Sequence, residues 1–343
     1  MKKCLFLILY FLLSVVVLVS LAFVVAEPFL RKAGLGNQGW KLVVPIMQPD
    51  PDLGWVGRPN VSSQEKYWLG NKNWVSVFLQ IDKDGFRAMS QARPKNAEKC
   101  VVLLGDSNAF GVGVDTAHTI ASQLQSMFGA RVAVFNFGFP GYGPHQTLRS
   151  LELERERKLL RECKNLHFTL LAMEEHISRV TGRLPWIPST PKYRVEDGHA
   201  VYSGPFFPEW MIKLNKKMED FVLTGLVLGF LMGYGETPTI QDWQLYDSVL
   251  AGIQELIHTR YHSSLTIIYL MKGQPSTLAR FAGFKNPKLK VEFFEDLVGD
   301  RGGQENVLQE YYLADHMHLN NNGNEFLANL IFRRANNLWK RNQ

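Results

Sequence analysis

The chain has 343 residues, of which 46% are hydrophobic and 20% charged, and its formal net charge is +6. This composition, without low-complexity tracts or internal repeats, excludes a disordered or repeat protein and allows one large domain with an appendage. The basic residues are scattered along the chain, which argues against nucleic acid as a partner and favours a mildly basic surface beside an anionic bilayer.

The first element is an apolar segment. Lys2 and Lys3 precede an uncharged run from residue 4 to residue 26. At ~1.5 Å per residue, this run is long enough to cross the ~30 Å hydrocarbon layer, whereas a cleavable signal peptide has only ~7–15 apolar residues. We therefore expect residues 1–26 to form an N-terminal transmembrane helix, with a signal peptide cleaved after residue 26 as the alternative. The two lysines favour a cytoplasmic N-terminus, which leaves the rest of the chain periplasmic or extracellular.

Residues 27–95 are expected to form an irregular lead-in that packs on the following domain. They are rich in Pro, Gly, Asn and Trp, and they contain clusters of turn-forming residues at 49–52 and 57–60. One alternating stretch, residues 75–81, is compatible with a strand.

From residue 96 onward, short apolar strands alternate with amphipathic helices, which predicts a central parallel sheet covered by helices on both faces. The expected strands cover residues 100–104, 131–135, 166–173, 265–270 and 291–294. The expected helices cover residues 119–128, 144–163, 243–257 and 323–339.

An insertion at about residues 180–240 interrupts this alternation. Its proline-rich first half predicts a loop. Its second half contains an uncharged stretch at residues 221–233, which is too short to span a bilayer upright. We expect a buried or lid-like helix there, with a segment resting on the membrane surface as the alternative.

Cys100 and Cys163 each stand at the start of an expected strand. They are able to pair in an oxidising compartment, and two buried free thiols are the equal alternative. No CxxC spacing occurs, so the cysteines do not indicate a metal site.

Two strand ends carry residues suited to catalysis. The first expected strand ends in Gly105-Asp106-Ser107-Asn108, and the second in Asn136 and a glycine-rich loop that includes Gly141. A serine at a tight turn after a strand exposes its hydroxyl, and glycines allow the backbone to approach a ligand closely. A phosphate-binding loop is the alternative for the second motif, but the Lys-Ser/Thr pair of a P-loop is absent.

A third motif, Asp315-His316-Met317-His318, precedes the last expected helix. An aspartate three residues before a histidine can orient the imidazole, which in turn can take the proton of a hydroxyl. The alternative is metal binding by the Asp-His-x-His cluster, although no further ligands are evident to complete such a site.

Taken in order, these three motifs resemble the SGNH/GDSL hydrolase superfamily. The resemblance covers about residues 50–340 except the insertion, and it implies a flavodoxin-like, three-layer α/β/α fold without a cofactor. It implies that Ser107 attacks an ester carbonyl, with His318 as base and Asp315 as the group that orients it. It also implies that the N–H groups of Ser107 and Gly141 form the oxyanion hole.

Four further residues near these motifs are candidate substrate contacts, and Asn136 also looks like a residue that shapes its loop. They are Asp106, Asn108, Asn136 and His145.

The chain departs from the family at the end of the third strand, where the family has an asparagine that donates to the oxyanion. Here the strand runs into Met173-Glu174-Glu175-His176. A carboxylate repels an oxyanion, so we name His176 as the substitute donor. We expect a serine esterase acting on an ester-bearing small molecule, lipid or glycan. The alternatives are an O-acyltransferase that modifies an envelope polysaccharide, and a catalytically weakened binding protein on the same fold.

Overall fold

The computed structural model describes most of the chain after the first apolar segment. The described residues are 39–69, 72–184, 186–187, 189–218, 221–233, 235–270, 289–299 and 303–341, together with parts of 10–32. Among these residues, no helix is long and apolar enough to cross a membrane. Most of the expected anchor, residues 4–26, lies outside the described residues, so the anchor stays a prediction.

A five-stranded sheet forms the centre of the molecule, with the order β12-β11-β8-β6-β7 and every neighbouring pair parallel. The strands are β6 Lys99–Leu104, β7 Val132–Asn136, β8 Asn165–Met173, β11 Leu265–Leu270 and β12 Lys290–Phe293. All five agree with the strands expected from the apolar runs. Counted along the chain, the order is the flavodoxin-like 2-1-3-4-5, with its switch point beside the first strand, β6.

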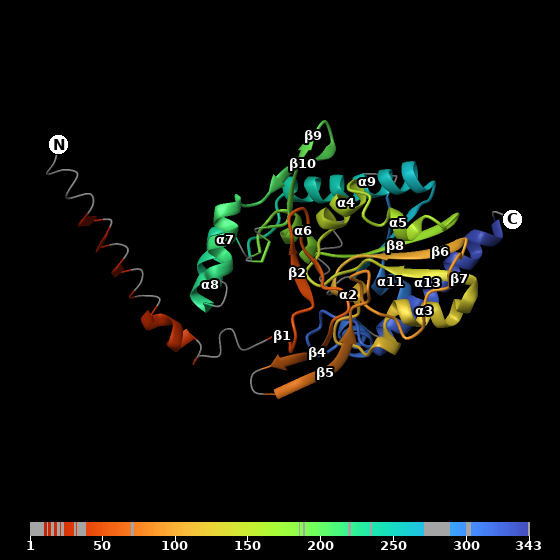
Figure 1. Cartoon of the computed structure of the whole chain (residues 1–343), viewed down its shortest axis with the longest axis horizontal. Coiled ribbons are helices and arrows are strands. Elements are labelled where there is room, and N and C mark those ends of the chain that lie inside the picture. Colours follow the sequence, from red (N-terminus) through yellow and green to blue (C-terminus); the bar gives the residue numbers. More distant parts are fainter. Residues whose placement is uncertain are drawn as a thin grey trace.

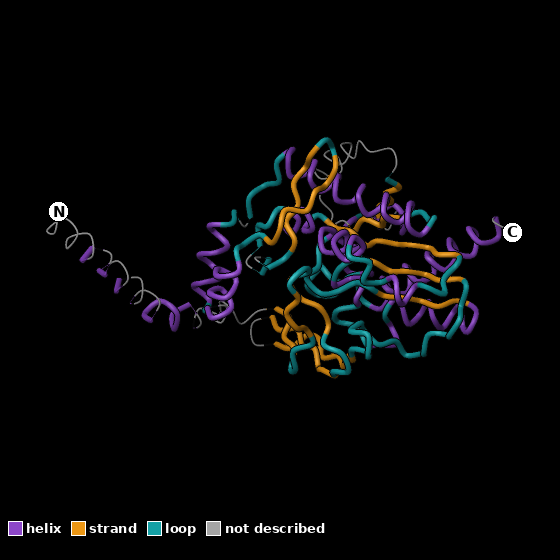
Figure 2. Tube along the Cα trace, turned by 45° about the horizontal axis from the view of Figure 1, so that its top comes forward, coloured by secondary structure: helices purple, strands orange, loops and turns teal. Residues whose placement is uncertain are grey.

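Helices cover both faces of this sheet (Figures 1 and 2). Alternate residues of β6 point to opposite faces, because side chains in a strand alternate. Cys100, Val102 and Leu104 join the core beneath α4 (Pro144–Glu152), α6 (Glu175–Val180) and α9 (Ile240–Tyr261). Val101 and Leu103 join the core beneath α3, α11, α12 and α13. These helices are α3 Ile120–Phe128, α11 Phe294–Val298, α12 Gln304–Tyr311 and α13 Asn321–Arg341.

The helix expected over residues 144–163 is wrong in its second half. It ends at Glu152, and Glu154 adopts a left-handed conformation (φ 54°) before the short α5, Arg157–Leu160. Arg155 in this break forms ion pairs with Asp50 and Asp52 of the lead-in. These long-range contacts favour a turn at a position where helical propensity alone would favour continuation of the helix.

The lead-in is more regular than expected, since only the strand at residues 75–81 was anticipated. It forms a three-stranded antiparallel sheet, β1-β4-β5, and the hairpin β2-β3. The bounds are β1 Gly39–Leu42, β2 Met47–Asp50, β3 Gly54–Gly57, β4 Ser62–Leu69 and β5 Lys72–Gln80. The buried side chains of β4 include the polar Ser63 and Glu65. The alternation of buried and exposed positions in this strand is therefore not visible in the sequence as an alternation of apolar and polar residues. Ile46, Leu79 and their neighbours pack on Phe110 and Phe139, which follow β6 and β7.

The first half of the insertion, expected to be a loop, contains an antiparallel hairpin of β9 (Pro191–Glu196) and β10 (His199–Pro205). Tyr193 anchors it, since this side chain is buried and its hydroxyl donates to Glu152 Oε2 at 2.8 Å. The second half forms two helices, α7 (Glu209–Met218) and α8 (Val222–Leu231). Both lie beside the body of the domain, away from the central sheet (Figures 1 and 2).

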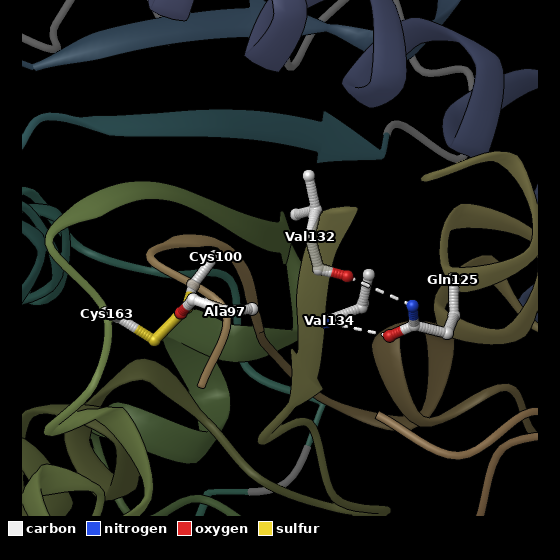
Figure 3. The surroundings of a disulfide bond; sticks show 6 residues. All are labelled: Ala97, Cys100, Gln125, Val132, Val134 and Cys163. Carbon is white, nitrogen blue, oxygen red and sulfur yellow. Dashed lines mark hydrogen bonds between the residues drawn. A yellow bond between two sulfur atoms is a disulfide. The ribbon is translucent and has the colours of Figure 1, made fainter. Parts of the chain in front are cut away.

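A disulfide joins Cys100 of β6 to Cys163, with their Cα atoms 5.7 Å apart (Figure 3). Of the two alternatives open from the sequence, the structure therefore contains the pair and not the free thiols. On the other side of β7, the buried amide of Gln125 donates to Val132 O and accepts from Val134 N, each at 3.0 Å. Gln125 thus pairs backbone groups of an edge strand that would otherwise have no partner in the sheet.

We predict that reduction of this disulfide destabilises the protein, because the bond closes a loop with a sequence separation of 63 residues. The chain-entropy estimate for such a loop is about 4 kcal/mol. Urea unfolding with and without reductant measures the loss. The double variant Cys100→Ala/Cys163→Ala is the control, and reductant should leave its unfolding midpoint unchanged.

Candidate active site

The nucleophile candidate lies at the carboxyl end of the central strand β6. Gly105 follows the strand with φ +141°, and a Cβ there would lie 2.9 Å from Leu171 O, so the tight turn requires glycine. Asp106 then caps the one-turn helix α2 (Ser107–Phe110) by accepting from Asn108 N at 2.9 Å. This turn places Ser107 at the switch point of the sheet, where open α/β folds bind their ligands.

The three residues expected to form a triad lie in one line of contacts. His318 Nε2 is 2.9 Å from Ser107 Oγ, although the two residues are separated by 211 positions in the chain. His318 Nδ1 is 2.5 Å from Asp315 Oδ2. The other oxygen of Asp315 accepts from Met317 N and His318 N, both at 3.0 Å. The aspartate therefore fixes the backbone of the loop and also orients the imidazole toward Ser107.

Asp315 is held as a carboxylate. Its partial burial would raise its pKa, but the hydrogen bonds and charge of His318 and the bond from Met317 N lower the pKa to about 2. An ionised Asp315 accepts the Nδ1–H of His318, so the unprotonated Nε2 is the nitrogen that can take a proton from Ser107.

Asn108 ties the nucleophile turn to the loop that carries His318. Its Oδ1 accepts from Leu319 N at 2.9 Å, and its Nδ2 donates to Met317 O at 3.3 Å. These bonds connect residues on both sides of His318 to the residue after Ser107. Because both polar atoms of its amide are bonded to this loop, Asn108 positions the loop, and the expectation that it contacts substrate is corrected.

The glycine-rich loop after β7 is shaped as the sequence suggests. Asn136 donates to Ala109 O at 2.7 Å and accepts from Gly138 N at 3.0 Å. Gly141 has φ +81°, and Trp55 and Trp186 lie against it, 3.1 and 3.7 Å from where a Cβ would stand. Asn136 is buried and its amide is occupied by the backbone, so it shapes the loop and is not a substrate contact.

Two further candidate substrate contacts lie inside the protein. Asp106 is 1% exposed, and Arg179 Nη1 donates to its Oδ2 at 3.0 Å. His145 is fully buried, with its Nε2 3.2 Å from Thr190 Oγ1. Burial, the neighbouring imidazole of His176 and the positive charge of Arg179 lower the pKa of His145 to about 3, so its ring is neutral. Neither residue presents an open polar atom, because both are committed to the protein interior.

His176 does not lie where an oxyanion donor is needed. Its Nε2 is 3.1 Å from Asp106 Oδ2, and its side chain is 1% exposed. Its Nδ1 is buried as well. Since Nε2 faces the carboxylate of Asp106, the expectation that His176 replaces the family's asparagine is corrected.

Three buried charged residues at the site were not anticipated as site residues. Glu65 of β4 accepts from Gly113 N at 2.8 Å, and Arg87 donates to Gly111 O and, at 2.6 Å, to Val114 O. They fix the segment that follows α2. Arg179 is the third. It follows His176 by three residues on one helix, so the two side chains share a face, and this spacing was the sequence feature that could have identified Arg179 as a site residue.

Among the described residues, no three His, Cys, Asp or Glu side chains gather as ligands for a metal ion. His316, the third member of the Asp-His-x-His cluster, is exposed, whereas His318 is buried against Ser107.

No protein-family model and no curated protein sequence matches the chain. Solved structures do. One is a lipase, Lip_vut3, from a goat rumen metagenome, with 16% identity over 69% of this chain and 97% of the lipase, at a TM-score of 0.34. Another is AlinE4, an SGNH-hydrolase family esterase, with 14% identity over 62% of this chain and 83% of the esterase, at a TM-score of 0.30.

We predict that Asp315 makes stability depend on pH in the acid range. Its pKa is about 2 in the folded protein, against 3.8 for an unperturbed aspartate, so its stabilising effect is complete above pH 3.8 and is lost as the pH falls through 2. This shift corresponds to about 2 kcal/mol. The difference in unfolding free energy between the unmodified protein and Asp315→Asn should shrink by about that amount between pH 5 and pH 2. A constant difference over this range, measured by urea unfolding, would contradict it.

Proposed function

We propose that the protein is a serine-dependent ester hydrolase of the SGNH/GDSL type that works through an acyl-enzyme. The observation that carries this proposal is the line of contacts from Asp315 through His318 to Ser107 at the switch point of the sheet. A hydroxyl within reach of an imidazole whose tautomer is fixed by a carboxylate is the arrangement that activates a serine.

In the proposed first step, Ser107 Oγ forms a bond to the carbonyl carbon of the ester while His318 Nε2 takes its proton. Asp315 accepts the Nδ1–H and stabilises the imidazolium that forms. His318 then returns the proton to the departing alcohol as the ester bond breaks, which leaves the acyl group on Ser107. Water attacks the acyl carbon while His318 Nε2 takes its proton. His318 then gives this proton to Ser107 Oγ as the bond between the acyl group and Ser107 breaks, and the free acid leaves.

The negative charge that develops on the carbonyl oxygen requires donors aimed at it. We assign this role to the backbone N–H groups of Ser107 and Gly141. The supporting observations are the tight turn at Gly105 and the left-handed Gly141, which shape the two loops that carry these groups.

Transfer of the acyl group to a sugar hydroxyl would use the same three side chains, with the acceptor in place of water. Acyl transfer that depends on an added polysaccharide acceptor would identify this activity. A protein that binds an ester or glycan without reacting would show no covalent adduct on Ser107.

We further propose that the protein acts outside the cytoplasm on a membrane anchor formed by residues 4–26. One observation supports this location, and a second concerns the chain that follows the anchor. The disulfide between Cys100 and Cys163 suits an oxidising compartment. In addition, the buried Glu27 accepts from Val222 N and Leu223 N at 3.0 and 3.1 Å, so the chain just after the apolar segment is bound to the start of α8.

The helices α7 and α8 carry exposed apolar side chains that agree with a position near a lipid surface. They include Trp210, Leu214, Leu226, Val227 and Phe230. These exposed side chains favour a segment that rests on the membrane surface over a buried or lid-like helix at residues 221–233.

We predict that a fluorophosphonate probe labels Ser107, and that Ser107→Ala removes both the label and ester turnover. The fall in kcat should exceed about 10⁴-fold, because the nucleophile and its base act as a unit. Ser248→Ala is the matched control, since this half-buried serine of α9 donates to Gln244 O and lies outside the candidate site. Turnover that survives Ser107→Ala would falsify the assignment.

We predict that the mature protein retains residues 1–26 and resists extraction from membranes by alkaline carbonate. The intact mass of the purified protein decides the first point. A mass that corresponds to a chain beginning at Glu27 would show that the segment is a cleaved signal peptide.

A further inference from the structure

The carboxylate of Asp106, directly before the nucleophile, lies in a buried polar cluster that the proposed mechanism does not use. His176 and Arg179 reach it from α6, with His176 Nε2 at 3.1 Å and Arg179 Nη1 at 3.0 Å from the same oxygen, Oδ2. All three side chains are nearly excluded from solvent. A buried charge requires a partner, and here the partner comes from the helix that follows the neighbouring strand β8.

The cluster contains one full ion pair and one neutral ring. Burial alone would raise the pKa of Asp106, but the contacts of His176 and Arg179 and the bond from Asn108 N outweigh it, so the pKa is lowered. Burial lowers the pKa of His176 despite the nearby Asp106 carboxylate. Arg179 therefore supplies the positive charge, and His176 supplies a neutral polar contact.

Arg179 also holds a second loop. The same Nη1 donates to Tyr142 O at 2.5 Å. Tyr142 directly follows Gly141 in the glycine-rich loop. One guanidinium group thus contacts the residue before Ser107 and the residue after Gly141.

The surroundings leave this arrangement little freedom. A Cβ on Gly143 would lie 3.0 Å from Arg179 Cβ and 2.6 Å from His145 Nδ1, so the loop packs directly on the arginine. The hydroxyl of Tyr142 donates to Trp55 O at 2.6 Å on the other side. Tyr142 is therefore fixed at both its side chain and its carbonyl group.

We propose that Arg179 is a positioning residue that clamps the nucleophile turn to the glycine-rich loop and so sets the separation of the two oxyanion N–H groups. This inference rests on the proposed function for the roles of Ser107 and Gly141. The clamp itself is a property of the fold that can be measured without any turnover.

The test compares Arg179→Lys with the unmodified full chain. Lysine keeps a positive charge near Asp106, but its side chain is one bond shorter, so its ammonium falls short of the position of Nη1, the nitrogen that contacts both loops. We expect faster amide hydrogen exchange at residues 105–111 and 137–143, with the exchange of β8 and β11 unchanged. We also expect kcat to fall by about 10²-fold, the cost of misplacing reacting groups by about 1 Å, while KM stays unchanged.

Arg183→Lys is the matched control, because Arg183 forms a partly buried ion pair with Asp242 at 2.6 Å and lies four residues further along the chain, without a contact to Asp106 or Tyr142 among the described residues. It should alter neither the exchange of the two loops nor kcat. As a second measurement, free guanidinium should restore part of the kcat lost in Arg179→Ala by entering the vacated space.

Unchanged exchange in both loops of Arg179→Lys would overturn the clamp, whatever the activity. Faster exchange spread over the whole sheet would overturn it as well, since it would show a general loss of stability. If the unmodified protein does not react with a fluorophosphonate, the proposed function fails, and the exchange of the two loops still decides whether Arg179 clamps them.

Discussion

The pairing of β6 between β7 and β8 is the constraint on which the site depends. Because the three strands are parallel, their carboxyl ends meet at one edge of the sheet. That edge receives the turn of Ser107 from β6, the glycine-rich loop from β7 and the helix α6 from β8. The loop of Asp315 and His318 arrives separately, from the start of α13, and Asn108 binds its backbone to the nucleophile turn. A site assembled from four segments thus depends on one pattern of strand pairing.

Holding these segments together places several charges inside the protein, and each is matched by a specific partner. Asp106 is matched by Arg179, and Glu65 accepts a backbone N–H from the segment after α2. Burial raises the pKa of Glu65, and the bond from Gly113 and the charge of Arg87 oppose that rise. Removing one partner from such a pair is costly because it leaves a buried group unpaired. Since Glu65 lies on β4, the lead-in is part of the support of the site and not only a linker to the N-terminal segment.

The central sheet was predictable because buried parallel strands are continuous apolar runs, and each of the five runs forms a strand. The lead-in was not predictable to the same degree, because β4 turns the polar Ser63 and Glu65 inward and so hides its alternation. The break in the helix expected at residues 144–163 depends on contacts of Arg155 with residues about a hundred positions away, which local periodicity does not contain. The expected anchor lies largely outside the described residues.

The sequence by itself determined which chemical groups the site contains and which of them share a loop. Asp315 and His318 are three residues apart, so their contact is local and could be expected from spacing alone. Only the tertiary structure decided what the other polar residues do. His176 and Asn108 carry side chains suited to an open site, but burial commits His176 to Asp106 and Asn108 to the loop of His318. Folding likewise brings Arg179 within hydrogen-bond distance of Asp106 and Tyr142 O. The role of a polar side chain is set by such partners, and they come from segments that are distant in the sequence.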